Sequence, residues 1–352
     1  MRYLWKRKAL WSVLILLVML CAACSNIPDQ RTGTTSTSPG NTPGASSPSA
    51  SGGRTILSQV VPARSGASVA YDARHNQVVL FGGDATNDTW AWNGQSWAQL
   101  FPASVPPVRS GASMAYDAAT GQIILFGGTG VTGTALGDTW AWNGGNWIPL
   151  SPSVSPPARA QASMVYDTQH QQIVLFGGMV MGGQHTSPSA NDTWVWNGTN
   201  WQQEHPKTTP PARAQADMAY DEAHHQAVLF GGTNGVSVLN DTWAWNGSDW
   251  QSLRPATSPV ARAGGSMAYD ASSQQVVLFG GTGAADLNDT WVWNGSNWEQ
   301  HPVRSSPKGS YIASAYDASN QAIVAYVVAI QNKTVGASQT WLWKGNDWTM
   351  SQ

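Results

Sequence analysis

The chain has 352 residues, a formal net charge of −2 and only 11% charged residues. Four basic residues, Arg2, Lys6, Arg7 and Lys8, precede the first apolar segment, and their removal leaves a net charge of about −6. This balance excludes nucleic acid as an expected partner, because nucleic-acid binding requires a basic surface.

Residues 1–23 have the pattern of a signal peptide. A basic start precedes the apolar run 9–20, which is too short to span a membrane comfortably. The segment Cys21-Ala22-Ala23-Cys24 resembles a bacterial lipobox, with Cys21 where leucine is usual. The resemblance implies a lipoprotein in which Cys24 is lipidated. A plain secretory peptide or an uncleaved anchor is the alternative.

Residues 24–54 consist mainly of Ser, Thr, Pro and Gly. Such a segment cannot bury enough apolar surface to offset the entropy lost on ordering, so it is predicted to be a disordered tether whose ends lie about 30 Å apart. Cleavage leaves Cys24 as the only cysteine, so no disulfide is expected. We therefore expect an exported protein, anchored by its N-terminal lipid to the extracytoplasmic side of a bacterial membrane.

Residues 55–352 repeat one unit six times, with a period near fifty. One copy contains Tyr166-Asp167, Leu175-Phe176-Gly177-Gly178, Asn191-Asp192-Thr193-Trp194 and Trp201. In the first copy, four strands are predicted at 67–71, 77–81, 89–92 and 97–100, and Asn93-Gly94 is a hairpin signal between the last two. Because no segment has a helical period, these sheets must cover one another. The sequence predicts an all-β fold, a six-bladed β-propeller of four-stranded antiparallel blades.

The unit resembles the kelch repeat over residues 62–349. The resemblance rests on an Arg before the first strand, the Gly-Gly pair after the second, the aromatic residue on the third and the Trp that opens the fourth. It implies a propeller like the galactose-oxidase central domain. The sequence of the repeat resembles the form found in exported bacterial proteins. The sixth copy departs from it at Gly309, Val327-Val328, Gln339 and Lys344. We also predict that Thr55–Val60 adds a strand near Trp348 and helps to join the ends.

Most repeated residues are expected to be structural. Of the 20 tryptophans, two lie in the leader and the rest fall three to a blade, which predicts packing between neighbouring sheets. The Gly-Gly pairs indicate either a positive φ or close approach of a neighbouring Trp that a Cβ would block.

The candidate binding face follows from strand direction. The loops between second and third strands vary in length and are expected to share one face with the blade-to-blade links, whereas the first-to-second turns on the opposite face are uniform. Five arginines lie at the variable end of the innermost strands and are expected to ring the channel mouth: Arg64, Arg109, Arg159, Arg213 and Arg262. Such a ring would receive an acidic group. The alternative is that each arginine bonds backbone carbonyls or the repeated Asp of Asn-Asp-Thr in a neighbouring loop.

Residues that break the repeat are further ligand-binding candidates. Asp217 replaces a serine that we placed at Ser68, Ser113, Ser163, Ser266 and Ser314. Gln161 and Gln215 replace glycines, and His185 lies in the longest loop. Ordinary drift at tolerant positions is the alternative.

No catalytic residue, metal site or cofactor is predicted, because the sequence has no nucleophile elbow, zincin motif or clustered Cys/His set. His75, His170, His224 and His225 occupy uniform turns and are expected to be solvated. The first hypothesis is a surface-anchored, non-catalytic module that binds a protein or carbohydrate. The alternative is a small sugar-processing enzyme of the sialic-acid mutarotase or lyase type, using Arg and Asp at the channel mouth.

Overall fold

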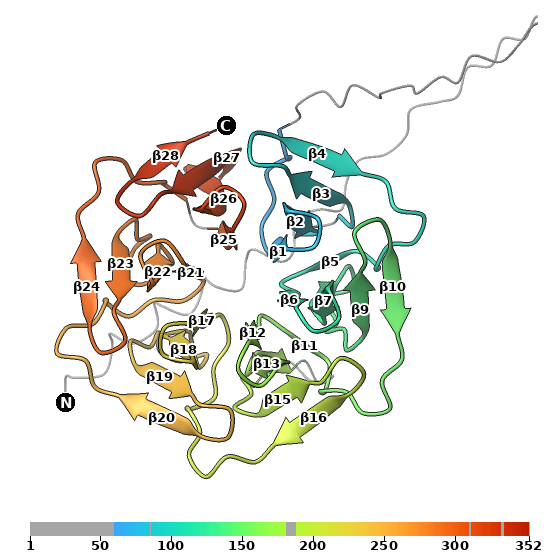
Figure 1. Ribbon diagram of the computed structural model, residues 1–352, viewed down its shortest axis with the longest axis horizontal. Helices are drawn as coiled ribbons and strands as arrows, with labels where there is room; N and C mark the ends of the chain where they lie inside the picture. Colours follow the sequence, from blue (N-terminus) through green and yellow to red (C-terminus); the bar gives the residue numbers. More distant parts are fainter. Residues whose placement is uncertain (1–59, 85, 181–187, 310, 332–333, 352) are drawn as a thin grey trace, which may run out of the picture. The chain divides into compact units, whose positions relative to one another are not determined.

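The computed structural model describes residues 60–84, 86–180, 188–309, 311–331 and 334–351, which form six blades around a central axis (Figure 1). Each blade is a four-stranded antiparallel sheet whose strands follow one another from the axis to the rim. The predicted fold class is therefore confirmed. In the residues described here, no helix is long and apolar enough to cross a membrane.

The strands recur at equivalent positions of the repeat. The first three blades contain β1 (Ser68–Asp72), β2 (Gln77–Phe81), β3 (Thr89–Trp92) and β4 (Trp97–Leu100); β6 (Ser113–Asp117), β7 (Gln122–Phe126), β9 (Thr139–Trp142) and β10 (Trp147–Leu150); β12 (Ser163–Asp167), β13 (Gln172–Phe176), β15 (Thr193–Trp196) and β16 (Trp201–Glu204). The last three contain β17 (Asp217–Asp221), β18 (Gln226–Phe230), β19 (Thr242–Trp245) and β20 (Trp250–Leu253); β21 (Ser266–Asp270), β22 (Gln275–Phe279), β23 (Thr290–Trp293) and β24 (Trp298–His301); β25 (Tyr311–Asp317), β26 (Ala322–Gln331), β27 (Thr334–Trp343) and β28 (Trp348–Met350). Two short ribbons pair β5 (Arg109–Ser110) with β8 (Thr129–Gly130) and β11 (Arg159–Ala160) with β14 (Met179–Val180).

Tryptophan joins each blade to the one before it. The Trp that opens each fourth strand is 0–3% exposed and lies 5.3–5.6 Å, ring to ring, from the Trp that ends the third strand. Its indole nitrogen donates to the threonine hydroxyl of the preceding blade, as from Trp147 to Thr89 at 2.9 Å. The same bond from Trp97 to Thr340, at 2.8 Å, connects the first blade to the sixth. The structure thus confirms that these tryptophans pack between blades.

The Gly-Gly pairs have the positive φ that was suggested, but the suggested contact with a Trp is wrong, because the close neighbour is the backbone of the next blade. Gly177 and Gly178 have φ of 69° and 94°. The Gly178 nitrogen donates to the Arg213 carbonyl of the next blade at 2.9 Å, and a Cβ on Gly177 would lie 2.5 Å from that same oxygen. The pair therefore ends the second strand where two blades touch through their main chains.

Blade six is irregular, as its sequence predicts. Val327-Val328 continue β26 instead of ending it, so β26 and β27 form a hairpin with a bulge between Val328 and Ile330. Val61 is 2% exposed and packs in one cluster with Tyr326 and Val328, and the Tyr326 hydroxyl donates to the Pro62 carbonyl at 2.8 Å. The strand predicted at Thr55–Val60 lies outside the described residues except for Val60, which is not in a strand.

The blade-to-blade links were expected to lie on the variable-loop face, but they lie there only in part. After the fourth strand, each link first passes the third-to-fourth turn of the next blade. The Ser104 amide donates to Asn146 of that turn at 2.8 Å, and Ser153 does the same to Asn200 at 2.7 Å. The reason is that the outermost strand runs toward the next blade along the rim, so the link begins beside that turn (Figure 1).

Candidate functional site

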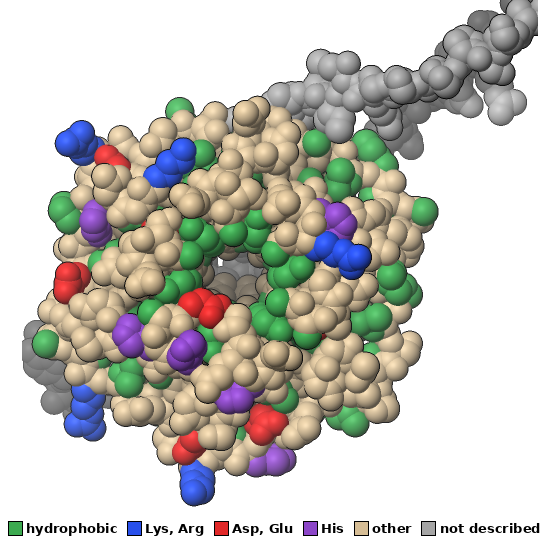
Figure 2. Space-filling model, viewed as in Figure 1, with side chains coloured by type: hydrophobic (Ala, Val, Ile, Leu, Met, Phe, Trp, Pro, Cys, Tyr) green, Lys and Arg blue, Asp and Glu red, His purple; other side chains and the backbone are tan. Residues whose placement is uncertain are grey.

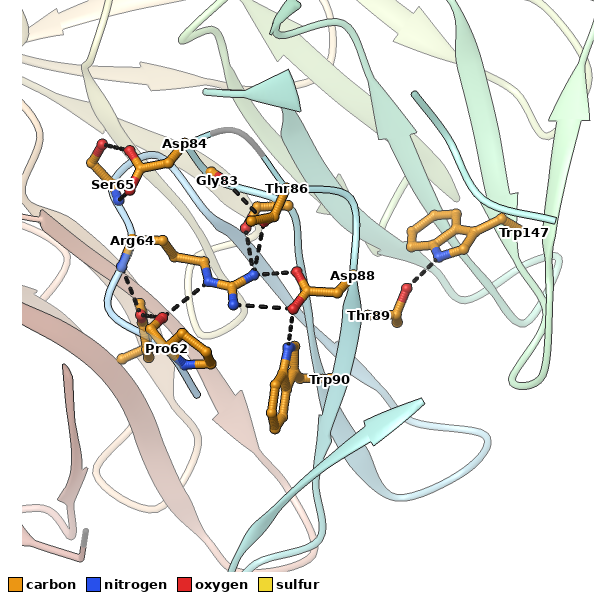
Figure 3. Close-up of polar contacts among 12 residues, drawn as sticks. Pro62, Arg64, Ser65, Gly83, Asp84, Thr86, Asp88, Thr89, Trp90 and Trp147 are labelled. Carbon is orange, nitrogen blue, oxygen red and sulfur yellow. Dashed lines mark hydrogen bonds and ion pairs between the residues drawn. The ribbon is translucent and has the colours of Figure 1, made fainter. Parts of the chain in front are cut away.

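The five repeated arginines lie at the predicted end of the innermost strands, but they do not ring the channel mouth. Their side chains are 0–2% exposed, and each pairs with the Asp of Asp-Thr-Trp in its own blade. Figure 3 shows the arrangement in blade one, where Arg64 meets Asp88 and Asp88 also accepts the Trp90 indole nitrogen at 2.7 Å. Figure 2 shows the face on which the histidines of the uniform turns lie, and there hydrophobic side chains and one acidic side chain border the central opening.

Most of the hydrogen-bonding capacity of these arginines is engaged by the protein. In blade three, Arg159 donates to both Asp192 oxygens at 2.6 and 2.8 Å, to the Gly177 carbonyl at 2.9 Å and to the Pro157 carbonyl at 3.0 Å. Burial acts to raise the pKa of Asp192, but the bonds from Arg159 and Trp194 outweigh it and hold that pKa below its usual value. The arginines are thus clamps between a link, a Gly-Gly pair and a loop, which is the alternative that the sequence left open.

A collar of main-chain hydrogen bonds runs along the channel just beyond the innermost strands of the first five blades. It runs from blade to blade through residues with positive φ: Gly66, Gly111, Gln161, Gln215 and Gly264. From Gly111 to Gly264, each amide donates to the carbonyl of the preceding collar residue at 2.7–3.0 Å. Gln161 and Gln215 have φ of 58° and 55° and are both partly exposed, so two glutamine side chains stand on this collar in a strained conformation.

Asp217 lies below the collar, in the wall of a cavity on the axis. The cavity has a volume of about 170 Å³ and is lined by the innermost strands of all six blades. In the first three blades the equivalent serine donates to a carbonyl of the next blade at 2.7 Å, as Ser68 does to Ala112. Asp217 has no such proton donor when ionised, and its Oδ2 has no hydrogen-bond partner among the described residues.

The strand register corrects the assignment of the serine position in blade six. Ser68 and Ser266 pair with Phe81 and Phe279, and their counterpart opposite Tyr326 is Ala313. Ser314 is one residue further along, and it meets Ser266 instead, with 2.7 Å between the two hydroxyl oxygens. Sequence reasoning counted Ser314 as equivalent because its serine matched by type, although its distance from Tyr316 did not.

Asp217 predicts a specific pH dependence. Burial raises its pKa to about 7, so the folded state binds a proton that the unfolded chain releases near pH 4. Its contribution therefore destabilises the fold as pH rises through this window. We expect Asp217→Ser to raise the melting temperature by several degrees at about pH 8 and by less at about pH 5. Thermal unfolding of both proteins across this range checks the expectation, and an equal difference at both values would contradict it.

The histidines on the opposite face were expected to be solvated, but three of them also make specific contacts with the protein. His75, His170 and His224 each lie within 2.7–2.9 Å, through Nδ1, of the Asp three residues earlier. Each ring also packs against the glycine of the next blade's Asn-Gly turn; a Cβ on Gly144 would lie 2.1 Å from His75. In the described residues, no group of three or more His, Cys, Asp or Glu side chains could hold a metal.

Blade two lacks this donor, which gives a second prediction. Thr120 stands in the histidine position, and the buried Oδ2 of Asp117 has no partner among the described residues, although Gly198 leaves space opposite. Thr120→His is expected to increase the free energy of unfolding by about 0.5–1.5 kcal/mol, the net value of one hydrogen bond. Urea denaturation checks it, with Thr120→Ala as the control. A histidine variant no more stable than the alanine variant would contradict it.

The remaining candidates divide between the collar, the cavity and the loops. Gln161, Gln215 and Asp217 come together near the axis, whereas His185 lies outside the described residues. Gly265 was missed: it faces Asp217 where the first four blades have Ala67, Ala112, Ala162 and Ala216. The signal was a second break in the repeat, one blade later. The site therefore presents one carboxyl, several serine hydroxyls and main-chain groups to a ligand, and such groups can bind a polar molecule.

Comparison with known proteins identifies a family model and a solved structure that are similar to this chain. A family model described as the KLHDC2/KLHL20/DRC7 Kelch-repeats domain matches residues 88–246 and 143–326, which together cover more than half of the chain. A comparison with curated proteins finds no match. Among solved structures, that of YjhT is similar, with a TM-score of 0.63 and 16% identity over 84% of this chain and 99% of that one. At this identity the likeness supports the fold alone.

Proposed function

Because this chain belongs to the family of Kelch-repeat domains, we propose that its propeller is a non-catalytic binding module for a protein or carbohydrate. Kelch propellers are commonly protein-interaction modules. The ligand would contact the face formed by the loops between second and third strands, with the collar and the axial cavity at its centre.

One observation carries the proposal: one end of the ring varies while the other does not. Between the second and third strands, the chain runs from Phe81 to Thr89 in blade one but from Phe176 to Thr193 in blade three. In blade six, β26 leads almost directly into β27. At the other end, every first strand ends in Asp and the second begins after a four-residue turn. Loops that vary on a rigid scaffold are where binding proteins place their specificity.

The enzyme alternative gains no support from the geometry. It requires arginines and Asp217 to converge at the channel mouth, but Arg213 is 1% exposed and is bonded to Asp241 and to the Gly231 and Pro211 carbonyls. Of the residues that the structure describes, Asp217 then remains the one ionisable residue in the cavity wall. General acid–base chemistry and electrostatic stabilisation would each need a further group there.

A binding screen with surface variants tests the module. The full-length, detergent-solubilised chain is applied to a glycan array and to a displayed peptide library. Val131→Glu and Val236→Glu change loop residues that are 75% and 90% exposed, whereas Ala118→Glu changes an exposed turn on the opposite face. Binding lost in both loop variants and kept in Ala118→Glu supports the proposal. Binding lost only in Ala118→Glu would place the ligand on the other face and overturn it.

The anchoring of this module is also a proposal, and the leader supports it. A lipobox-like segment ends at Cys24, and the tether after it is poor in apolar residues. Cys24→Ser is expected to release the protein from the membrane fraction without changing its melting temperature, because the substitution lies outside the repeats. Detergent-phase partition measures this. A variant that still enters the detergent phase would show that the protein is held by something other than a lipid on Cys24.

A further inference from the structure

Among the described residues, Asp217 is the only ionisable one that lines the axial cavity. The other lining residues are small, hydroxyl-bearing or apolar, such as Ser266, Ser314, Met218 and Met267. The side chain is 6% exposed, and its Oδ2 is buried without a hydrogen-bond partner among the described residues. A carboxyl in this position breaks the sixfold pattern of the cavity at one point.

A second substitution in the neighbouring blade accommodates this carboxyl. Gly265 occupies the position that is alanine in the first four blades, and a Cβ there would lie only 2.7 Å from Oδ2 of Asp217. That contact is too close for an alanine to fit without displacing the carboxyl. Asp217 and Gly265 therefore face each other across the junction between β17 and β21, and the missing Cβ of Gly265 leaves room for the carboxyl.

The protein leaves the charge of Asp217 incompletely neutralised. Burial raises its pKa, and Arg262 and the Gly265 backbone N–H offset this only in part. Arg262 is already engaged by Asp289 at 2.7 and 2.8 Å and by the Gly280 carbonyl at 2.9 Å. No ion pair of Asp217 occurs among the described residues, and burial dominates its environment. A buried carboxylate without a partner is costly to the fold, and departures of this kind are expected at functional sites.

We propose that the axial cavity binds a small ligand bearing a protonated amine, with the Asp217 carboxylate as its counter-ion. The inference rests on the proposed binding function and names the ligand chemistry at the centre of that face. An ammonium group supplies the donors that Oδ2 lacks and the charge that Arg262 does not deliver. The terminal torsion of an aspartate is soft, so the carboxyl turns toward the ammonium without moving the backbone.

The rest of the cavity suits such a ligand. The adjoining hydroxyls of Ser266 and Ser314, 2.7 Å apart, accept further hydrogen bonds from the ammonium or from a neighbouring hydroxyl. Met218 and Met267 line the same space and contact methylene groups. A volume of about 170 Å³ admits a molecule of a few non-hydrogen atoms, or the amine-bearing end of a longer one.

Thermal shift with small probes tests the proposal. The full-length chain is titrated at about pH 8, where Asp217 is ionised and aliphatic amines remain protonated. Ethanolamine is the cationic probe, and ethylene glycol and sodium propionate are the neutral and anionic probes at matched ionic strength. We expect ethanolamine alone to raise the melting temperature, in a saturating manner, by about 3–5 °C at ten times its Kd.

Asp217→Ser is the matched variant, because it restores the serine of the first three blades and is expected to fold. In this variant ethanolamine should give no saturating shift. No shift in the wild type, or an equal shift in both proteins, overturns the proposal. A wild-type response to pH alone, with no effect of any probe, also overturns it and makes Asp217 a proton-binding group only. These outcomes are separate from the loop-variant screen, so a failed cavity site leaves the proposed binding function standing.

Discussion

Arg159→Met is expected to lower the free energy of unfolding by about 3–5 kcal/mol, the usual cost of removing one partner from a buried ion pair. The methionine fills similar space but leaves Asp192 without its bidentate partner. It also leaves the Gly177 and Pro157 carbonyls without the donors that now reach them at 2.9 and 3.0 Å. Urea denaturation followed by tryptophan fluorescence measures the change.

The double variant Arg159→Met/Asp192→Asn is the control for this prediction. It should be more stable than the sum of the single variants implies, because the second substitution removes the carboxylate that the first leaves unpaired. Blade six shows that the exchange is tolerated as a pair: Gly309 and Gln339 stand in the two positions, and Gln339 still accepts the Trp341 indole nitrogen at 3.0 Å. Strict additivity, or a loss below 1 kcal/mol in Arg159→Met, would show that the clamp contributes little.

Much of the fold could be predicted because each repeated residue makes the same contact in every blade. The threonine that opens each third strand accepts a hydrogen bond from the next blade's Trp in all six junctions. It therefore recurs because the packing of the blades requires it. Strand limits, blade number and the irregular sixth blade all follow from such recurrences. The path of the links could not be predicted, because it depends on how far the outer strand turns toward the rim, and no residue type encodes that angle.

The candidate site was less predictable, for a physical reason. Arginines at one end of a channel can point to the solvent or back into the protein, and sequence spacing does not distinguish the two. The repeat itself favoured the second reading, since Asp88 and its counterparts recur with the arginines. Asp217 was found as a break in the pattern, but its partner Gly265 was not, because the two contact each other across a blade junction 48 positions apart in the chain.

This contrast separates two kinds of position. Arg159 recurs in five blades and is bonded within its own blade, and Thr193 recurs in all six and accepts the Trp of the next blade. Asp217, which differs between blades, lies in the wall of the axial cavity and keeps a buried Oδ2 without a partner among the described residues. Function is therefore to be sought where the symmetry fails.

Gly177→Val should also be strongly destabilising, by about 3–5 kcal/mol, because two effects combine. Gly177 has a φ of 69°, which a β-branched residue adopts only with strain. Its Cβ would lie 2.5 Å from the Arg213 carbonyl, and that oxygen accepts the Gly178 amide at 2.9 Å and cannot retreat without breaking the junction between blades three and four. The midpoint of urea denaturation is the measurement.

Gly235→Ala isolates the backbone strain from the contact. Gly235 has a comparable φ of 84°, but a Cβ there would meet nothing within 4 Å, so the expected cost is only about 1–2 kcal/mol. A larger loss in Gly177→Val than in Gly235→Ala would measure what the blade junction requires of the Gly-Gly pair. If the two losses were equal, the junction would be yielding to the side chain, and the glycine would be present for its conformation alone. If Gly177→Val were as stable as the wild type yet lost ligand binding, the pair would belong to the binding face instead of the scaffold.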